Sequence, residues 1–154
     1  MQITDAYLVD KAHPEGNVSN SNVKILVVDD FEMVRMMLIN ALNDLGFHQI
    51  EEAEHGIMAL DMLKASHAAG HPFSIVFCDW TMPEMTGIEV LENCRKNENL
   101  KLLPFVMVTA ESEQESIVRA IKAGATDYLI KPISPELLEK KVYKILSKLS
   151  SSAA

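Results

Sequence analysis

The feature that most constrains this sequence is a regular alternation between apolar, β-branched runs and stretches whose apolar residues recur at helical spacing. The alternation begins at Val23 and continues through five strand–helix units. Continuous apolar runs are typical of strands that are buried on both faces of a parallel sheet. Because such units connect with one handedness, helices are expected on both faces of the sheet. The sequence therefore predicts an α/β fold, a doubly wound five-stranded parallel sheet with five helices.

The predicted elements are short and closely spaced. The strands are expected at residues 24–28, 49–53, 74–78, 104–108 and 128–130. The helical pattern runs through residues 34–45, 57–69, 90–94, 112–123 and 135–149. Glycines follow two of these helices, at Gly46 and Gly124, and favour their termination. Strand 49–53 is half polar, so we expect it near an edge of the sheet.

The two ends of the chain lie outside this pattern. Residues 1–22 show no clear period and end in a polar stretch, which predicts a flexible N-terminal tail. Residues 23–150 are expected to form one domain, and residues 151–154 a frayed C-terminus. The sequence has no apolar stretch of membrane-spanning length and no signal-peptide pattern, so we expect a cytoplasmic protein without a membrane partner.

Composition narrows the partners further. The formal net charge of −8 argues against nucleic acid, because phosphate binding normally needs a basic face. The two cysteines, Cys78 and Cys94, fall in apolar patterns and are predicted to be buried and reduced. The five histidines show no close metal-ligand spacing.

Residues with functional chemistry stand where the predicted strands end. In open α/β sheets, ligands bind beyond the carboxyl ends of the strands. These positions hold Asp29 and Asp30 after the first strand, Asp79 after the third, Thr109 after the fourth and Lys131 after the fifth. Each residue alone has an ordinary explanation, such as a helix cap, a turn or a surface lysine. Together, each in the right unit, they predict one convergent polar site.

The residue types at this site suit phosphoryl transfer. Clustered carboxylates repel one another, and a divalent cation relieves that repulsion. Because the available ligands are oxygen atoms, Mg²⁺ is favoured over Zn²⁺. A cation would also screen the approach of an anionic phosphoryl donor to a carboxylate nucleophile. Lysine and threonine can hold the remaining phosphoryl oxygens.

Five segments of the sequence resemble the response-regulator receiver family. They are residues 25–31 (ILVVDDF), 78–83 (CDWTMP), 108–111 (VTAE), 123–125 (AGA) and 128–132 (YLIKP). The resemblance extends from about residue 23 to residue 149 and is strongest to the chemotaxis regulators of the CheY type. It implies a flavodoxin-like receiver fold for the domain at residues 23–150.

The resemblance also implies roles for the carboxylates. Asp79 would be the phosphoacceptor. Mg²⁺ would be bound directly by Asp30, by Asp79 and by the backbone carbonyl of Thr81, while Asp29 would act through a coordinated water.

The remaining implied roles concern the phosphoryl group and the switch. Lys131 and Thr109 would contact the phosphoryl oxygens, and Tyr128 would move inward together with Thr109. The Lys131–Pro132 bond is expected to be cis, as in the family. A partner would then dock on the face formed by residues 112–123, 128–130 and 135–149.

The implied function is that of a single-domain response regulator in two-component, chemotaxis-type signalling. Such a protein accepts a phosphoryl group from a histidine kinase and signals by phosphorylation-dependent protein binding. Its chemistry would be Mg²⁺-dependent self-phosphorylation and self-dephosphorylation, not metabolic catalysis. The downstream target would be a protein such as a flagellar switch or a phosphatase.

Some alternatives stay open on the sequence. Chemotaxis regulators often carry asparagine at the position of Thr81 and a basic pair at those of Glu113 and Gln114, so the lifetime of the phosphorylated state and the flagellar target are not fixed. A phosphorelay shuttle that passes its phosphoryl group to a histidine phosphotransfer protein fits equally well. A haloacid-dehalogenase-type phosphatase would need a second aspartate where Thr81 stands, and a nucleotide-binding module would need a glycine-rich loop. Both are disfavoured.

Overall fold

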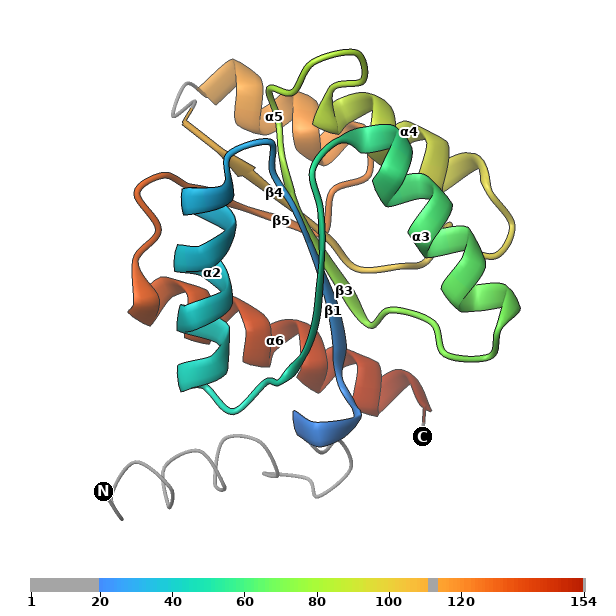
Figure 1. The fold of residues 1–154 in the computed structure, drawn as a ribbon, viewed down its shortest axis with the longest axis vertical. Coiled ribbons are helices and arrows are strands. Elements are labelled where there is room, and N and C mark those ends of the chain that lie inside the picture. Colours follow the sequence, from blue (N-terminus) through green and yellow to red (C-terminus); the bar gives the residue numbers. More distant parts are fainter. Residues whose placement is uncertain (1–19, 111–113, 154) are drawn as a thin grey trace.

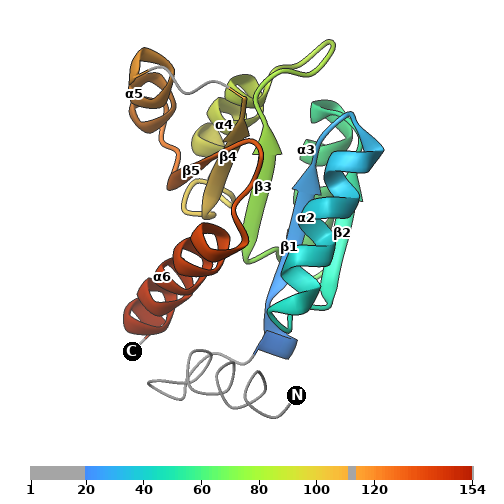
Figure 2. The same cartoon turned by 90° about the vertical axis from the view of Figure 1, so that its left-hand side faces the viewer.

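A computed structural model of the chain describes residues 20–110 and 114–153. The strands (Figure 1) form one parallel sheet in the order β2-β1-β3-β4-β5, which can be followed in Figure 2. The strands are β1 (Lys24–Val28), β2 (Gln49–Ala53), β3 (Ile75–Asp79), β4 (Phe105–Thr109) and β5 (Asp127–Ile130). The order places β2 at an edge of the sheet, as its half-polar sequence predicts.

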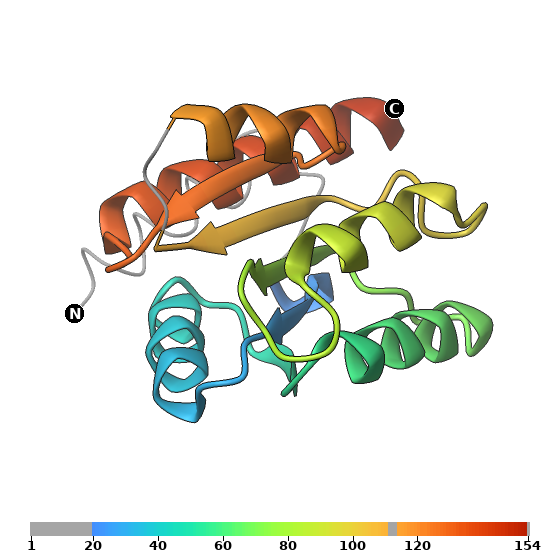
Figure 3. The ribbon, with the colours of Figure 1, turned by 90° about the horizontal axis from the view of Figure 1, so that it is seen from above.

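Helices cover both faces of the sheet. Figures 2 and 3 show α2 and α6 on one face, and α3, α4 and α5 on the other. The described helices are α2 (Glu32–Asp44), α3 (Gly56–Ala68), α4 (Gly87–Lys96), α5 (Gln114–Lys122) and α6 (Pro135–Ala153), preceded by the 3₁₀ turn η1 (Asn20–Asn22). The predicted fold class, a doubly wound five-stranded α/β sheet with five helices, is therefore confirmed.

The central strands contribute side chains to two separate hydrophobic cores, because successive side chains point to opposite faces of the sheet. From β1, Ile25 and Val27 pack with α2 and α6, whereas Leu26 and Val28 pack with α3 and α4. Strands β3 and β4 are buried along their whole length. This two-sided burial explains the uninterrupted apolar runs in the sequence.

The predicted boundaries agree with the observed ones within a few residues, apart from the end of the last helix. Helix α6 continues to Ala153, four residues beyond the expected end at residue 149. The predicted tail lies outside the described residues except for the turn η1, where the Asn20 side chain donates a hydrogen bond to the carbonyl of Leu45 at 2.9 Å. The predicted start of the fourth helix, at residue 112 before α5, also lies outside the described residues.

Helix α2 departs from a simple amphipathic pattern. Met37, one of its regularly spaced apolar residues, is 61% exposed, and its neighbours Met33 and Met36 are exposed too. The cationic Arg35 is buried instead. The apolar face that α2 presents to the core is therefore narrower than the sequence indicates. One of the buried positions of α2 holds an arginine.

Both cysteines are free and buried, as predicted. Burial raises the pKa of Cys94 to about 11, which keeps this thiol protonated near neutral pH. In the described part of the chain, no helix combines the length and the apolar character that a membrane crossing requires.

Candidate phosphorylation and metal site

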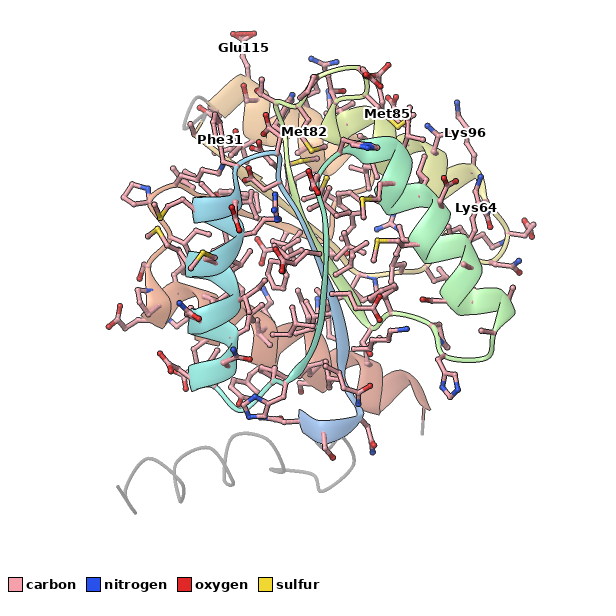
Figure 4. All side chains as sticks on the ribbon, in the orientation of Figure 1. Phe31, Lys64, Met82, Met85, Lys96 and Glu115 are labelled. Carbon is pink, nitrogen blue, oxygen red and sulfur yellow. The ribbon has the colours of Figure 1, made fainter. Side chains whose placement is uncertain are left out.

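The carboxyl ends of β1, β3, β4 and β5 surround a depression of about 390 Å³. Figure 4 labels two residues of its rim, Phe31 before α2 and Met82 after β3. The depression is lined by Asp30, Phe31, Asp79, Thr81, Met82, Pro83, Thr109, Ala110 and Lys131. The residues that the sequence places at four different strand ends therefore meet in one place.

Three carboxylates gather at this site. Asp29, Asp30 and Asp79 each offer an oxygen, and these oxygens lie within 4.8 Å of one another. Asp29 is 2% exposed and Asp79 is 6% exposed, so water screens their repulsion poorly. Lys131 bridges the two buried carboxylates, with its Nζ atom 3.0 Å from Asp29 Oδ2 and 3.1 Å from Asp79 Oδ1.

The electrostatics of this group are unbalanced. Burial raises the pKa of the Asp79 carboxyl, and the nearby charge of Asp29 raises it further, although Lys131 acts in the opposite direction. Burial alone would lower the pKa of Lys131, but its hydrogen bonds to Asp29 and Asp79 outweigh that effect and raise it. Lys131 thus stays charged near neutral pH, and one ammonium faces three carboxylates.

Asp29 and Asp30 differ in how they are held. Asp29 accepts the backbone N–H of Phe31 on Oδ1 at 2.9 Å and Lys131 on Oδ2. Asp30 Oδ1 is buried and has no hydrogen-bond partner among the described residues. Neither aspartate caps α2, whose N-cap residue is Phe31 without a side-chain cap bond. The simple explanation of this acidic pair as a helix cap is therefore not supported.

These features fit a divalent cation such as Mg²⁺. A buried, unpartnered carboxylate oxygen needs a ligand, because buried polar groups are costly when left unsatisfied. Here that oxygen belongs to Asp30, whose carboxylate is grouped with those of Asp29 and Asp79. The donors are all oxygen atoms, as hard cations prefer.

The connection between β3 and α4 is built tightly around Asp79. Gly87, the first residue of α4, has no room for a side chain, since a Cβ atom there would lie 2.2 Å from the backbone oxygen of Asp79. Its N–H donates to the carbonyl of Trp80 at 2.7 Å. Thr86 and Glu89 form a reciprocal capping box that fixes the start of the helix. Sequence reasoning missed the role of Gly87, although a glycine at a strand-to-helix connection was its signal.

The two residues predicted to form the switch lie in different surroundings. Thr109 is 3% exposed at the end of β4, lines the depression and accepts the N–H of Lys131 on its backbone oxygen at 2.8 Å. Tyr128 is half-buried on the neighbouring strand, outside the depression, and the ammonium of Lys141 lies 4.5 Å from its ring centre. The Lys131–Pro132 bond is cis, as expected.

The family of the chain follows from comparison with known proteins. The model of the response regulator receiver domain matches residues 25–143. The chain therefore belongs to the response-regulator receiver family, a class of phosphoacceptor switches whose members bind Mg²⁺ at an acidic pocket.

Chemotaxis regulators of the CheY type are among the proteins similar to this chain. The chain is 44% identical to chemotaxis protein CheY-3 of Vibrio cholerae over 132 residues, which cover 86% of this chain and 98% of that protein. It is 41% identical to chemotaxis protein CheY of Pseudomonas aeruginosa over 128 residues, 83% of this chain and 99% of that protein. This places the chain among receiver domains of CheY-type response regulators.

Solved structures agree with this assignment. CheY4 of Vibrio cholerae aligns with a TM-score of 0.71 and 32% identity, covering 80% of this chain and 98% of that one. CheY of Borrelia burgdorferi, in a complex with CheX, BeF₃ and Mg²⁺, aligns with a TM-score of 0.73 and 25% identity, covering 80% and 89%. The structural alignments therefore lead to the same family as the sequence comparisons.

Proposed function

We propose that this protein is a single-domain response regulator that accepts a phosphoryl group from a histidine kinase on Asp79. The receiver unit would span residues 23–150, which include the matched residues 25–143. The observation that carries the proposal is the buried Asp79 carboxylate, which shares Lys131 with Asp29 and lies beside the unpartnered oxygen of Asp30. Among the three carboxylates, Asp79 both lines the depression and stands at the end of a fully buried strand.

Mg²⁺ would be held by Asp30, Asp79 and the backbone carbonyl of Thr81, with Asp29 acting through a water. The bound cation would supply positive charge that lets an anionic donor approach a carboxylate. Lys131 and Thr109 both line the depression. The ammonium of the lysine and the hydroxyl of the threonine would donate hydrogen bonds to phosphoryl oxygens.

The transfer itself needs only Asp79 as a reacting group. A carboxylate oxygen of Asp79 attacks the phosphorus of a phosphohistidine as the phosphorus–nitrogen bond breaks, which leaves an acyl phosphate on Asp79. The bonding electrons stay on the ring nitrogen, and the donor leaves as neutral imidazole when its other ring nitrogen carries a proton. Lys131 can exchange its bond to Asp79 Oδ1 for one to the phosphoryl group while it keeps its bond to Asp29. Hydrolysis of the acyl phosphate by water would reset the protein.

Output would pass through the face formed by α5, β5 and α6. Thr109 ends β4 and pairs with Ile130 of β5, so its movement toward a phosphoryl group acts on that strand. A phosphoryl group shifts the equilibrium only through contacts that differ between two states, and the Thr109 hydroxyl supplies such a contact. Tyr128, next to this path, would move with it.

The identity of the target is a separate proposal. Figure 4 shows Glu115 projecting outward from α5, whereas Glu113 lies outside the described residues. If this acidic side chain takes part in docking, the target would present a basic segment. The Borrelia relative forms a complex with CheX, which supports a protein of that kind as one target class. A phosphorelay shuttle remains the alternative.

Acetyl phosphate with Mg²⁺ tests the phosphoacceptor assignment. Intact-mass analysis should show one added phosphoryl group on the wild type, and none on Asp79→Asn or after removal of Mg²⁺ by a chelator. Asp127→Asn is a matched control, because Asp127 pairs with Lys141 at the opposite end of β5. Labelling of Asp79→Asn at the wild-type rate would refute the assignment.

The lone tryptophan offers an optical test of the metal site. Trp80 adjoins Asp79 and is half-buried, so binding of Mg²⁺ should change its emission. A titration that leaves the emission of the wild type flat would count against a cation site at this edge of the sheet.

A further inference from the structure

A buried arginine contacts the backbone of the acidic site. Arg35, in the first turns of α2, is 8% exposed. Its Nη1 donates a buried hydrogen bond to the backbone carbonyl of Asp29 at 2.7 Å, and its Nε pairs with Glu52 Oε1 on β2 at 2.7 Å. The side chain therefore joins the end of β1, the edge strand and the helix that follows the site. Burying an arginine is costly unless its hydrogen bonds are made, so this placement calls for a reason.

Arg35 completes the fixing of Asp29. The N–H of Asp29 donates to the carbonyl of Ala53, its own carbonyl accepts Arg35, and its carboxylate accepts Phe31 and Lys131. Every polar group of Asp29 is thereby used. The next residue in the chain is Asp30, whose carboxylate keeps an unpartnered buried oxygen. The carbonyl that Arg35 holds belongs to the peptide unit that joins these two residues, so its orientation sets the direction of Asp30.

We propose that Arg35 is a positioning residue of the cation site, acting through the Asp29–Asp30 peptide unit. Its hydrogen bonds go to the Asp29 backbone carbonyl and to Glu52, and not to the carboxylates of the site. Its role is to hold the backbone so that the Asp30 carboxylate points at the cation. The inference rests on the proposed Mg²⁺-dependent function and deepens it.

A purely electrostatic role for Arg35 makes the opposite prediction. A fixed positive charge behind a cation site repels the cation, so its removal alone would tighten Mg²⁺ binding. A positioning role predicts weaker binding, because groups that orient metal ligands typically contribute about 10- to 100-fold in affinity. The sign of the change therefore separates the two roles.

Three full-length variants test the proposal. Arg35→Met removes the donors and the charge, and we expect the Kd for Mg²⁺, measured by Trp80 emission and by NMR titration, to rise at least about 10-fold. Arg35→Lys keeps the charge without the planar fork, and we expect a smaller loss in the same direction. Glu52→Gln keeps the bond to the Asp29 carbonyl, so its Kd should stay within about twofold of wild type, because an ion pair to a half-exposed carboxylate contributes little.

Two further readouts separate positioning from general destabilisation. At saturating Mg²⁺, the rate of phosphorylation by acetyl phosphate should return toward the wild-type value in both Arg35 variants. In the metal-free protein, the Phe31 amide should exchange faster with solvent, whereas amides of α4 should not. Unchanged or tighter Mg²⁺ binding in Arg35→Met overturns the inference alone. Failure of the wild type to bind Mg²⁺ overturns the proposed function and this inference with it.

Discussion

Helices α4 and α5 are similar in length and cover the same face of the sheet, yet they are anchored very differently. Helix α4 buries five of its ten residues, namely Gly87, Ile88, Val90, Leu91 and Cys94. Helix α5 buries one of nine, Ala120. Val118 and Ile121 on α5 are 40% and 47% exposed. The helix that follows the proposed phosphoacceptor strand is locked in place, and the helix that follows the proposed switch threonine lies mostly on the surface.

This difference separates two tasks. Transfer chemistry needs a carboxylate, a cation and a lysine in fixed positions, which a buried helix start supports. Signalling needs an element that can shift at small energetic cost and that offers surface to a partner. Elements with few buried apolar contacts are the ones that move in switching proteins. The contrast between α4 and α5 therefore supports the proposal that α4 holds the chemical site in place and that α5 carries the output.

The largest effect should come from adding one carbon at the start of α4. Gly87→Ala places a Cβ atom 2.2 Å from the Asp79 backbone oxygen, so the strand end or the helix must move. We expect a loss of about 3 kcal/mol or more in unfolding free energy, measured by urea denaturation, together with slower phosphorylation.

Gly70→Ala is the control for this change. Gly70 has a positive φ of +84° but nothing within 4 Å of an added Cβ. Its backbone strain should cost only about 1 kcal/mol. Equal losses in the two variants would show that Asp79 is not held by close packing against α4.

A pair of core-to-alanine changes compares the two helices directly. Leu91 on α4 is fully buried, so Leu91→Ala should lower the unfolding free energy by about 2–5 kcal/mol. Ile121 on α5 is about half exposed, and Ile121→Ala should change it by no more than about 0.5 kcal/mol. Thermal and urea unfolding of both variants would measure the two losses in unfolding free energy. A loss in Ile121→Ala comparable with that in Leu91→Ala would contradict the contrast.

Much of this arrangement could be predicted from the sequence. Apolar runs fix the strands because a parallel sheet is buried on both faces, and the strand ends then bring Asp79, Thr109 and Lys131 to one edge. The unequal anchoring of α4 and α5 could not be predicted, because both helices carry regularly spaced apolar residues. Burial depends on what lies opposite each residue, which tertiary packing alone decides.

The site shows the same limit at the level of single residues. Asp29 and Asp30 are identical neighbours in the sequence, yet one is fully hydrogen-bonded and the other keeps an open oxygen. From the sequence, Arg35 would be expected on the solvent-exposed side of a helix, but it is buried. Its partners are the Asp29 carbonyl, directly after β1, and Glu52 on β2. Such contacts across elements leave no local signal in the sequence.

The pH dependence of stability should also distinguish the site from the output face. The folded Asp79 carboxyl has a raised pKa, whereas in the unfolded chain its pKa lies near 3.8. The folded state therefore binds the proton of the Asp79 carboxyl more tightly than the unfolded state does. This proton binding stabilises the folded state fully below pH 3.8, and the stabilisation is lost as pH rises through the raised folded pKa. The amide introduced by Asp79→Asn cannot ionise, so this variant should melt at a higher temperature than wild type at pH 7 in a chelator.

The advantage of Asp79→Asn should shrink as pH falls toward 3.8 and disappear below it, where wild-type Asp79 is protonated in both the folded and the unfolded state. Mg²⁺ should favour the wild type, which alone keeps the full ligand set. Glu115→Gln on α5 removes the same charge from an exposed position and should shift stability by less than about 0.5 kcal/mol. If the difference in melting temperature between Asp79→Asn and wild type did not change with pH, the pKa of the wild-type Asp79 carboxyl would not be raised by folding.

The smallest effect concerns the side-chain contact between the two regions. The Arg119 guanidinium on α5 lies 5.8 Å from the centre of the Trp80 ring, next to Asp79. At an exposed site, a cation–π contact of this kind is worth about 0.5–1 kcal/mol. A double-mutant cycle with Arg119→Leu and Trp80→Leu should therefore give a coupling energy below about 1 kcal/mol in urea unfolding. Lys122→Leu, which removes the same charge from the same helix, should show no coupling to Trp80. A coupling above about 2 kcal/mol would mean that α5 is tied to the site far more firmly than its single buried residue indicates, and the division between a fixed site and a loosely anchored output helix would then have to be given up.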